Sequence, residues 1–114
     1  MNDPDHLHIL WTSADPITAE KMVFMYAFNA LKNGWWKKVT VIIWGAASDL
    51  TGRSPDIQAE VKRVQAGGVA FSACKACADE LGVTGVLEGL GVEVIYWGEP
   101  LTVLLRERAA LLTI

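Results

Sequence analysis

The chain of 114 residues has little cysteine, no long apolar run and no strong excess of either charge. Ten basic and thirteen acidic residues leave a formal net charge of -3, and no basic run exceeds Lys37-Lys38, so nucleic-acid binding has little support. The most apolar stretch, residues 22–28, is shorter than the roughly 18 residues that a membrane-spanning helix needs. The composition therefore predicts neither a nucleic-acid partner nor a membrane anchor.

Residues 1–5 are polar and acidic and do not resemble an export signal, so a cytoplasmic location is expected. In a reducing compartment, two cysteines are more often reactive or simply packed than joined in a structural disulfide. Hydrophobic residues make up 52% of the chain and charged residues 20%. This balance indicates apolar surface that is hidden in an oligomer or that lines a large pocket.

Short apolar runs alternate with helical patterns along the sequence. Strands are expected at residues 6–11, 39–44, 69–72, 92–97 and 111–114, and a loop at residues 45–53. Asp15-Pro16 and Ser54-Pro55 are typical helix starts, and Pro100 is expected to open the last helix. The alternation predicts one α/β domain over residues 1–114, with three layers and helices on both faces of a parallel sheet.

The first expected helix, residues 16–33, is apolar nearly all round. A helix without a clear polar face is usually buried on several sides. The domain core would cover one side, and a subunit contact would cover another.

The two cysteines follow the third expected strand directly. With Ser72 as the helix cap, Cys74 would lie in the first turn and Cys77 about one turn deeper on the same side. Backbone N–H groups and the helix dipole at such a position favour the thiolate, which is the reactive form of cysteine. Cys74 is therefore the better candidate nucleophile. The alternative is that both cysteines are small packing residues.

A metal site at the C-x-x-C pair would need more ligands, because structural zinc takes four. His6 and His8 are the obvious additional candidates. They begin the first strand, whereas Cys74 follows the end of the third, so a strand length of roughly 17–20 Å is expected between them. No metal and no cofactor is predicted. A thioredoxin-like site is also disfavoured, because Lys75-Ala76 separates the cysteines and no suitable proline precedes a later strand.

Two strands end in the same way, with Val-Ile-Ile-Trp-Gly at Trp44-Gly45 and Val-Ile-Tyr-Trp-Gly at Trp97-Gly98. Open α/β sheets bind ligands at the carboxyl ends of their strands. These four residues are thus candidates for substrate binding, although tryptophans also pack in cores and interfaces. Glu99 follows at the same edge, and Arg53 is placed where it could reach an anionic substrate.

The chain resembles the DsrE/DsrF-like family of small sulfur-relay proteins over most of its length. The resemblance is carried by the run from Gly68 to Cys74, by Gly82-Val83 eight residues beyond Cys74, by the Leu-Gly-Val-Glu-Val entry to the fourth strand at residues 90–94, and by the terminal strand. In sulfur carriers of that family, the cysteine at the position of Cys74 accepts sulfur as a persulfide. Some members lack this cysteine, and several carriers have alanine where this chain has Cys77.

The resemblance implies a five-stranded parallel sheet in the order 4-3-2-1-5 and a trimeric or hexameric assembly. In that order, Trp44 and Trp97 flank the strand that leads to Cys74. The expected mouth of the site is framed by four residues (Trp44, Gly45, Trp97, Gly98), with Thr12 and Ser13 one strand further away. Ser72, Ser13 and Glu99 complete the expected substrate-binding set.

The leading hypothesis is a cytoplasmic sulfur-transfer protein that carries a persulfide on Cys74 and exchanges sulfur with donor and acceptor proteins or small persulfides. A dithiol redox module that uses Cys74 and Cys77 is the second hypothesis. The third is a non-catalytic, oligomeric module that binds a small molecule or a partner.

Overall fold

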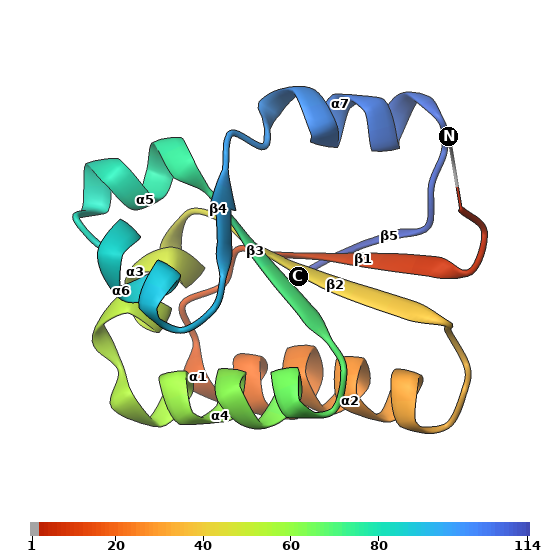
Figure 1. The fold of residues 1–114 in the computed structure, drawn as a ribbon, viewed down its shortest axis with the longest axis horizontal. Coiled ribbons are helices and arrows are strands. Elements are labelled where there is room, and N and C mark those ends of the chain that lie inside the picture. The colour runs from red at the N-terminus through yellow and green to blue at the C-terminus, as the bar shows by residue number, and fades with distance from the viewer. Residues whose placement is uncertain (1–2) are drawn as a thin grey trace.

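The computed structural model describes residues 3–114, and Figure 1 shows their arrangement. The strands are β1 (His6–Trp11), β2 (Lys38–Ile43), β3 (Ala70–Cys74), β4 (Glu93–Ile95) and β5 (Leu111–Thr113). The helices are α1 (Pro16–Thr18), the π-helical segment η1 (Ala19–Phe24), α2 (Met25–Lys32), α3 (Ala46–Arg53), α4 (Pro55–Ala66), α5 (Lys75–Leu81), α6 (Thr84–Gly89) and α7 (Gly98–Arg106).

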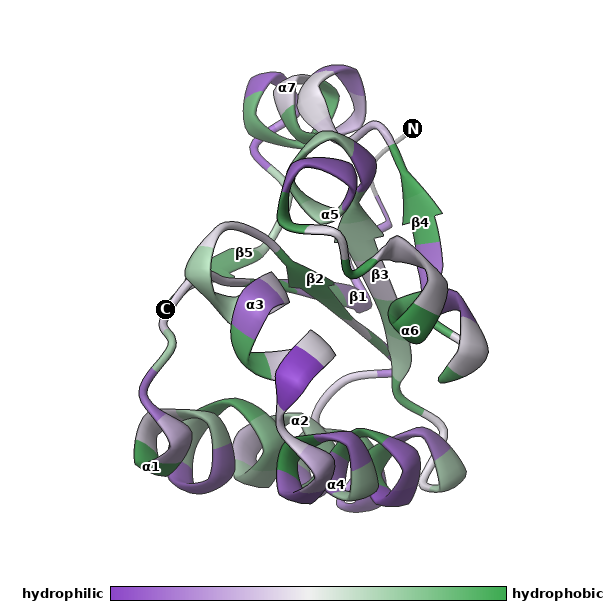
Figure 2. Cartoon of the chain, turned by 90° about the vertical axis from the view of Figure 1, so that its left-hand side faces the viewer, coloured by the Kyte–Doolittle hydropathy of each residue, from purple (hydrophilic) through white to green (hydrophobic). Residues whose placement is uncertain are grey.

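The five strands form one parallel sheet in the order β4-β3-β2-β1-β5, as predicted. Helices α1, α2 and α4 cover one face of this sheet, and α7 lies over the other (Figure 1). Helices α3, α5 and α6 gather beyond the carboxyl ends of the strands, where they face the viewer in Figure 2. The three-layer α/β class and the strand order are therefore confirmed.

The main core fills the face beneath α1, α2 and α4. Ile9, Val41 and Phe71 are neighbours in the strand register, so their side chains share this face. All three are buried, and Phe71 meets Phe24 of η1 with ring centroids 6.1 Å apart. This continuous apolar layer holds the central strands in place and so positions their carboxyl ends.

The opposite face carries a smaller apolar cluster. Ile42, Cys74 and Trp97 are its buried members, and Leu101 and Leu104 of α7 pack against them. Polar residues share this face, because His8 and Thr40 are register neighbours on β1 and β2. Cys74, at the end of β3, thus belongs to the cluster on the less apolar face of the sheet.

Only one side of the first helical segment enters the core. Val23, Phe24 and Ala27 are buried, whereas Ile17 and Met25 are exposed. The domain core therefore covers one side of this segment, and the expected subunit contact on the other side stays a prediction.

The expected loop at residues 45–53 is wrong, because residues 46–53 form helix α3. Gly45 has a φ of 62°, which lets the chain turn sharply from β2 into this helix. Ala47, Ser48 and Thr51 are buried on its inner side. Such small residues give no apolar periodicity, so the helix has no clear sequence pattern.

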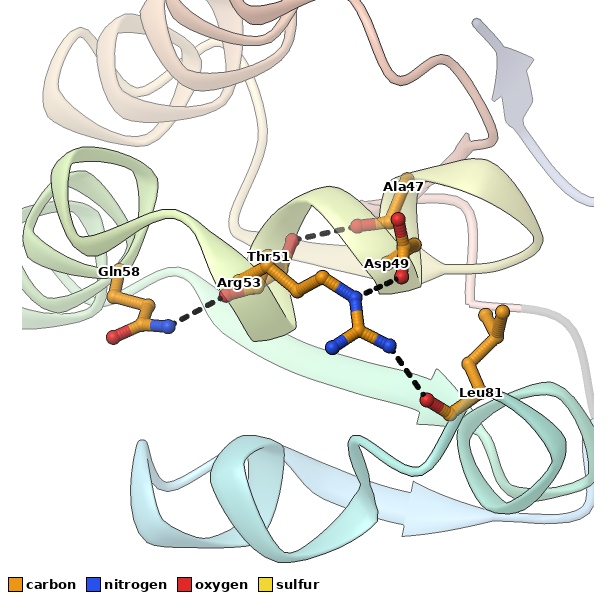
Figure 3. Close-up of polar contacts among 6 residues, drawn as sticks. All are labelled: Ala47, Asp49, Thr51, Arg53, Gln58 and Leu81. Atoms are coloured by element: carbon orange, nitrogen blue, oxygen red, sulfur yellow. Dashed lines mark hydrogen bonds and ion pairs between the residues drawn. The ribbon is translucent and has the colours of Figure 1, made fainter.

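Polar contacts join α3 to its neighbours (Figure 3). Gln58 of α4 donates to the backbone oxygen of Thr51 at 3.0 Å. Arg53 pairs with Asp49 at 2.5 Å and donates to the backbone oxygen of Leu81 at 3.0 Å. The guanidinium of Arg53 thus ties α3 to the end of α5, and its expected contact with an anionic substrate stays a prediction.

Candidate functional site

Cys74 ends strand β3 and precedes helix α5 directly. Pairing with β4 joins Cys74 to Ile95, so the strand continues two residues past Ser72. The backbone of Cys74 is extended (φ -72°, ψ 117°), and this residue, not Ser72, occupies the helix cap. The predicted position of Cys74 inside the first turn is therefore wrong, because the helix begins two residues later than expected, although the strand-to-helix junction is confirmed.

Ser72 is buried within β3 and supports Trp97. The indole Nε1 of Trp97 donates to the Ser72 hydroxyl at 2.7 Å, and this hydroxyl donates to the backbone oxygen of Glu93 at 2.8 Å. The Glu93 carboxylate also lies 3.3 Å from the hydroxyl. Ser72 is thus a positioning residue for one wall of the site. Its expected role as the helix cap is wrong, and its expected role in substrate binding stays a prediction.

A cavity of about 810 Å³ adjoins Cys74. Four further sequence-predicted residues line it, namely Trp44, Trp97, Gly98 and Glu99. The other lining residues are His8, Ala76, Tyr96, Pro100, Val103, Leu104 and Glu107. Cys74 is only 4% exposed, but it forms part of the cavity wall. The cavity is therefore the route by which a small molecule could reach this residue.

Three predicted mouth residues lie outside the cavity wall. Gly45 serves the turn into α3. The Ser13 hydroxyl accepts a hydrogen bond from the backbone N–H of Asp15 at 3.1 Å, where the first helix begins. Thr12 donates to the backbone oxygen of Ile114 and so ties β1 to the end of the chain. These residues shape the strand ends and do not line the cavity.

Cys77 is half-buried on α5. It does not line the cavity, but it packs against the apolar cluster that contains Cys74 and Trp97. Both cysteines are free thiols. The cysteine pair is thus brought together in one cluster, with Cys74 alone in the cavity wall.

His8 lines the same cavity as Cys74, although the two residues stand on different strands. The imidazole of His8 meets the indole of Trp97 edge to face, with ring centroids 6.5 Å apart. The chain passes from β4 into α7, which lies over this face of the sheet (Figure 1), and residues between 96 and 107 line the cavity together with His8. The apolar spacing of Leu101 and Leu104 was the available signal, because it indicates a helix that packs on this face.

Burial, together with the neighbouring charge of His6, lowers the pKa of His8 to about 4. The two rings stack with centroids 4.0 Å apart. Burial also lowers the pKa of His6, whose Nε2 lies 2.7 Å from the Thr40 hydroxyl. His8 is consequently uncharged at neutral pH and cannot supply a cation to the cavity.

Within residues 3–114, no group of three or more His, Cys, Asp or Glu side chains is arranged to hold a metal ion. In the same part of the chain, no helix is long and apolar enough to cross a bilayer. The arrangement that remains is a thiol at the wall of an aromatic cavity.

BT1422 from Bacteroides thetaiotaomicron, a conserved protein of unknown function, matches this chain over 96% of its residues, and the match covers 95% of BT1422. The two are 36% identical, with a TM-score of 0.94. The chain belongs to the BT1422 family. No protein-family model matches the chain, and no curated protein does so either.

Two more distant structures share the fold of the BT1422 family. MTH1491 from Methanobacterium thermoautotrophicum, a protein of unknown function, is 18% identical, with a TM-score of 0.69 and coverage of 96% of this chain and 98% of its own. The ychN protein from E. coli is also 18% identical, with a TM-score of 0.65 and coverage of 96% and 99%. At this identity the likeness concerns the fold alone.

Proposed function

We propose that the protein is a sulfur carrier of the DsrE/DsrF type that holds a persulfide on Cys74. The observation that carries this proposal is the position of Cys74, which ends strand β3 inside the sheet and lines a cavity of about 810 Å³. A thiol that is 4% exposed but borders a cavity can be reached by a small donor while most of its own surface is covered by protein. This setting suits a sulfur adduct that must survive between donor and acceptor.

The proposed step is a displacement at sulfur. The thiolate of Cys74 attacks the terminal sulfur of a donor R–S–S–H, a new S–S bond forms to Cys74, the donor S–S bond breaks, and R–S⁻ leaves. An acceptor thiolate reverses the step by attacking the outer sulfur of the Cys74 persulfide. The electron pairs balance, and no external oxidant is needed.

The neighbouring residues have supporting roles in this proposal. Trp97 forms part of the wall beside Cys74, and its hydrogen bond to Ser72 holds the indole in a fixed orientation. Trp44 lines the cavity from the end of the neighbouring strand. Partners would be sulfur donor and acceptor proteins or small persulfides, in the cytoplasm, and the carrier would act as a homo-oligomer.

The test is mass spectrometry of the protein after incubation with benzyl persulfide, an R–S–S–H donor with an aromatic R group, followed by peptide mapping. We expect one added sulfur atom on Cys74 in the wild type and in Cys77→Ala, and none at this position in Cys74→Ser. Absence of added sulfur on Cys74 in correctly folded protein would refute the proposal. The Cys77→Ala variant is the matched control, because it removes the other thiol and keeps the cavity wall intact.

One observation favours a second candidate, the dithiol redox module. Cys77 packs against the cluster that contains Cys74, so a persulfide or another oxidised form of Cys74 would have a second thiol close by. In that case, oxidation of the wild type would yield a reversible disulfide between the two residues. A sulfur adduct on Cys74 that accumulates equally in the wild type and in Cys77→Ala would count against this candidate.

A further inference from the structure

The cavity beside Cys74 has aromatic and aliphatic walls. Trp44, Tyr96 and Trp97 contribute three aromatic side chains. Val103 and Leu104 of α7 contribute aliphatic surface opposite the sheet. Flat aromatic molecules bind well in such surroundings, because they bury apolar area and stack against indole and phenol rings. The volume of about 810 Å³ accommodates a molecule of two or three fused or linked rings.

The wall of the cavity offers no cationic side chain. Its lining residues include the exposed Glu99, and none of them is lysine or arginine. The Lys75 ammonium lies 5.9 Å from the centre of the Tyr96 ring, but it is paired with Asp79 at 3.1 Å. An anion that entered the cavity would therefore lose hydration and gain no cationic partner in the wall, which is costly.

A polar side chain lies in the wall of this apolar site. The imidazole of His8 lines the cavity, and it is uncharged at neutral pH because burial lowers its pKa to about 4. A neutral imidazole can donate one hydrogen bond and accept another. A ligand that carries one N–H or hydroxyl group on an aromatic body would offer a partner to this imidazole.

We propose that this cavity binds an uncharged aromatic molecule with one hydrogen-bonding group and excludes anions. The assignment deepens the proposed function by naming the class of molecule that reaches Cys74. It rests on that function for the role of the ligand in sulfur exchange, and on the cavity alone for binding. Anionic donors such as thiosulfate would then enter the cavity poorly and react slowly with Cys74.

The test uses two fluorescent probes that differ by one charge. N-phenylnaphthylamine is uncharged, aromatic and carries one N–H, and anilinonaphthalene sulfonate is the same molecule with a sulfonate group. Fluorescence titration of the wild type should give a dissociation constant at least about tenfold lower for the uncharged probe, because burial of an unpaired anion costs more than the 1.4 kcal/mol that corresponds to this ratio. Equal or tighter binding of the sulfonate would overturn the proposal.

Two variants show whether the probe occupies this cavity. Val103→Trp fills it from α7 and should weaken N-phenylnaphthylamine binding by at least about tenfold. Val86→Trp is the matched control, because Val86 on α6 is 42% exposed, Val103 is 44% exposed, and only Val103 lines the cavity. Unchanged binding in Val103→Trp, or an equal loss in both variants, would contradict the assignment.

Glu99→Gln tests the charge argument separately. The sulfonate should bind about twofold to fivefold more tightly to this variant, because an exposed carboxylate repels it only modestly, and the uncharged probe should be unaffected. A gain for both probes alike would show that charge does not select the ligand.

The two proposals fail in different ways. If Cys74 takes up no sulfur and the uncharged probe still binds selectively, the cavity assignment stands and the protein is a binding module. If Cys74 takes up sulfur while the probes bind without charge preference, the carrier proposal stands and the ligand class is wrong. Cys74→Ser should retain probe binding, since the thiol is one part of a larger aromatic wall.

Discussion

At the scale of single residues, two buried serines illustrate how a polar group depends on its partner. Ser72 and Ser48 are both nearly inaccessible. The hydroxyl of Ser72 accepts from Trp97 and donates to the backbone of Glu93. The Ser48 hydroxyl has no hydrogen-bond partner among the described residues. The same residue type therefore stabilises the fold at one position and adds little at the other.

We predict that Ser72→Ala lowers the free energy of unfolding by about 1–3 kcal/mol, because it leaves the buried Trp97 N–H without an acceptor. Ser48→Ala should change it by less than about 0.5 kcal/mol or raise it, since the hydroxyl that it removes is unpaired. Urea unfolding of the three proteins checks this. A loss for Ser48→Ala as large as that for Ser72→Ala would refute the explanation.

His8 makes the stability of the fold depend on pH. Its pKa falls from 6.5 to about 4 on folding, so between these pH values the unfolded chain binds a proton that the folded chain does not. Stability therefore decreases as the pH falls from neutrality towards 4.

We predict that His8→Phe, which keeps an aromatic ring and removes the titrating group, weakens this pH dependence. The free energy of unfolding of the variant should fall less between pH 7 and pH 4.5 than that of the wild type. Urea titrations at a series of pH values provide the measurement, and the carboxylates contribute equally to both proteins. Parallel curves would show that His8 does not carry the effect.

At the scale of elements, helix α3 was the clearest omission from the sequence prediction. Its inner side consists of Ala47, Ser48 and Thr51, which are too small to create an apolar period. The helix is stabilised instead by close contact, because a Cβ on Gly52 would lie 2.5 Å from the Cβ of Val83. Its position is thus decided by a neighbour that is 31 residues away in sequence.

We predict that Gly52→Ala costs about 1–3 kcal/mol of stability, since the added methyl group overlaps the side chain of Val83. Gly85→Ala on α6 is the matched control, because no atom lies within 4 Å of its added Cβ, and this change should gain up to about 1 kcal/mol. Thermal and urea unfolding distinguish the two. The double variant Gly52→Ala/Val83→Ala should regain part of the stability that Gly52→Ala loses, because the smaller side chain relieves the clash. If Val83→Ala instead lowered the free energy of unfolding again by as much as Gly52→Ala did, a direct clash would be contradicted.

At the scale of the whole molecule, β1 and β2 sit in the middle of one sheet and are covered by helices from both ends of the chain (Figure 1). The terminal strand β5 pairs with β1, and β4 pairs with β3. No part of the described sheet can therefore unfold without exposing apolar surface elsewhere. This architecture favours a single cooperative transition.

We predict that circular dichroism and tryptophan fluorescence report the same unfolding midpoint. Separate midpoints for the two signals would contradict a single cooperative unit.

We also predict that N-phenylnaphthylamine stabilises the folded protein. At about 100 times its dissociation constant it should add about 2.7 kcal/mol to the free energy of unfolding of the wild type, because it binds only the folded chain. This added stability should be lost in Val103→Trp and kept in Val86→Trp.

The sequence by itself determined the alternation of strands and helices, the parallel sheet and the junction that ends at Cys74, because these follow from local apolar runs, caps and glycines. Only the tertiary structure decided that His8 shares a cavity with Cys74, that Ser72 serves Trp97, and that Arg53 ties α3 to α5. These relations join residues that are distant in sequence, and they arise when α7 packs over the open face of the sheet and α3 packs at its end. Such packing depends on how whole elements meet in space, which no local pattern records.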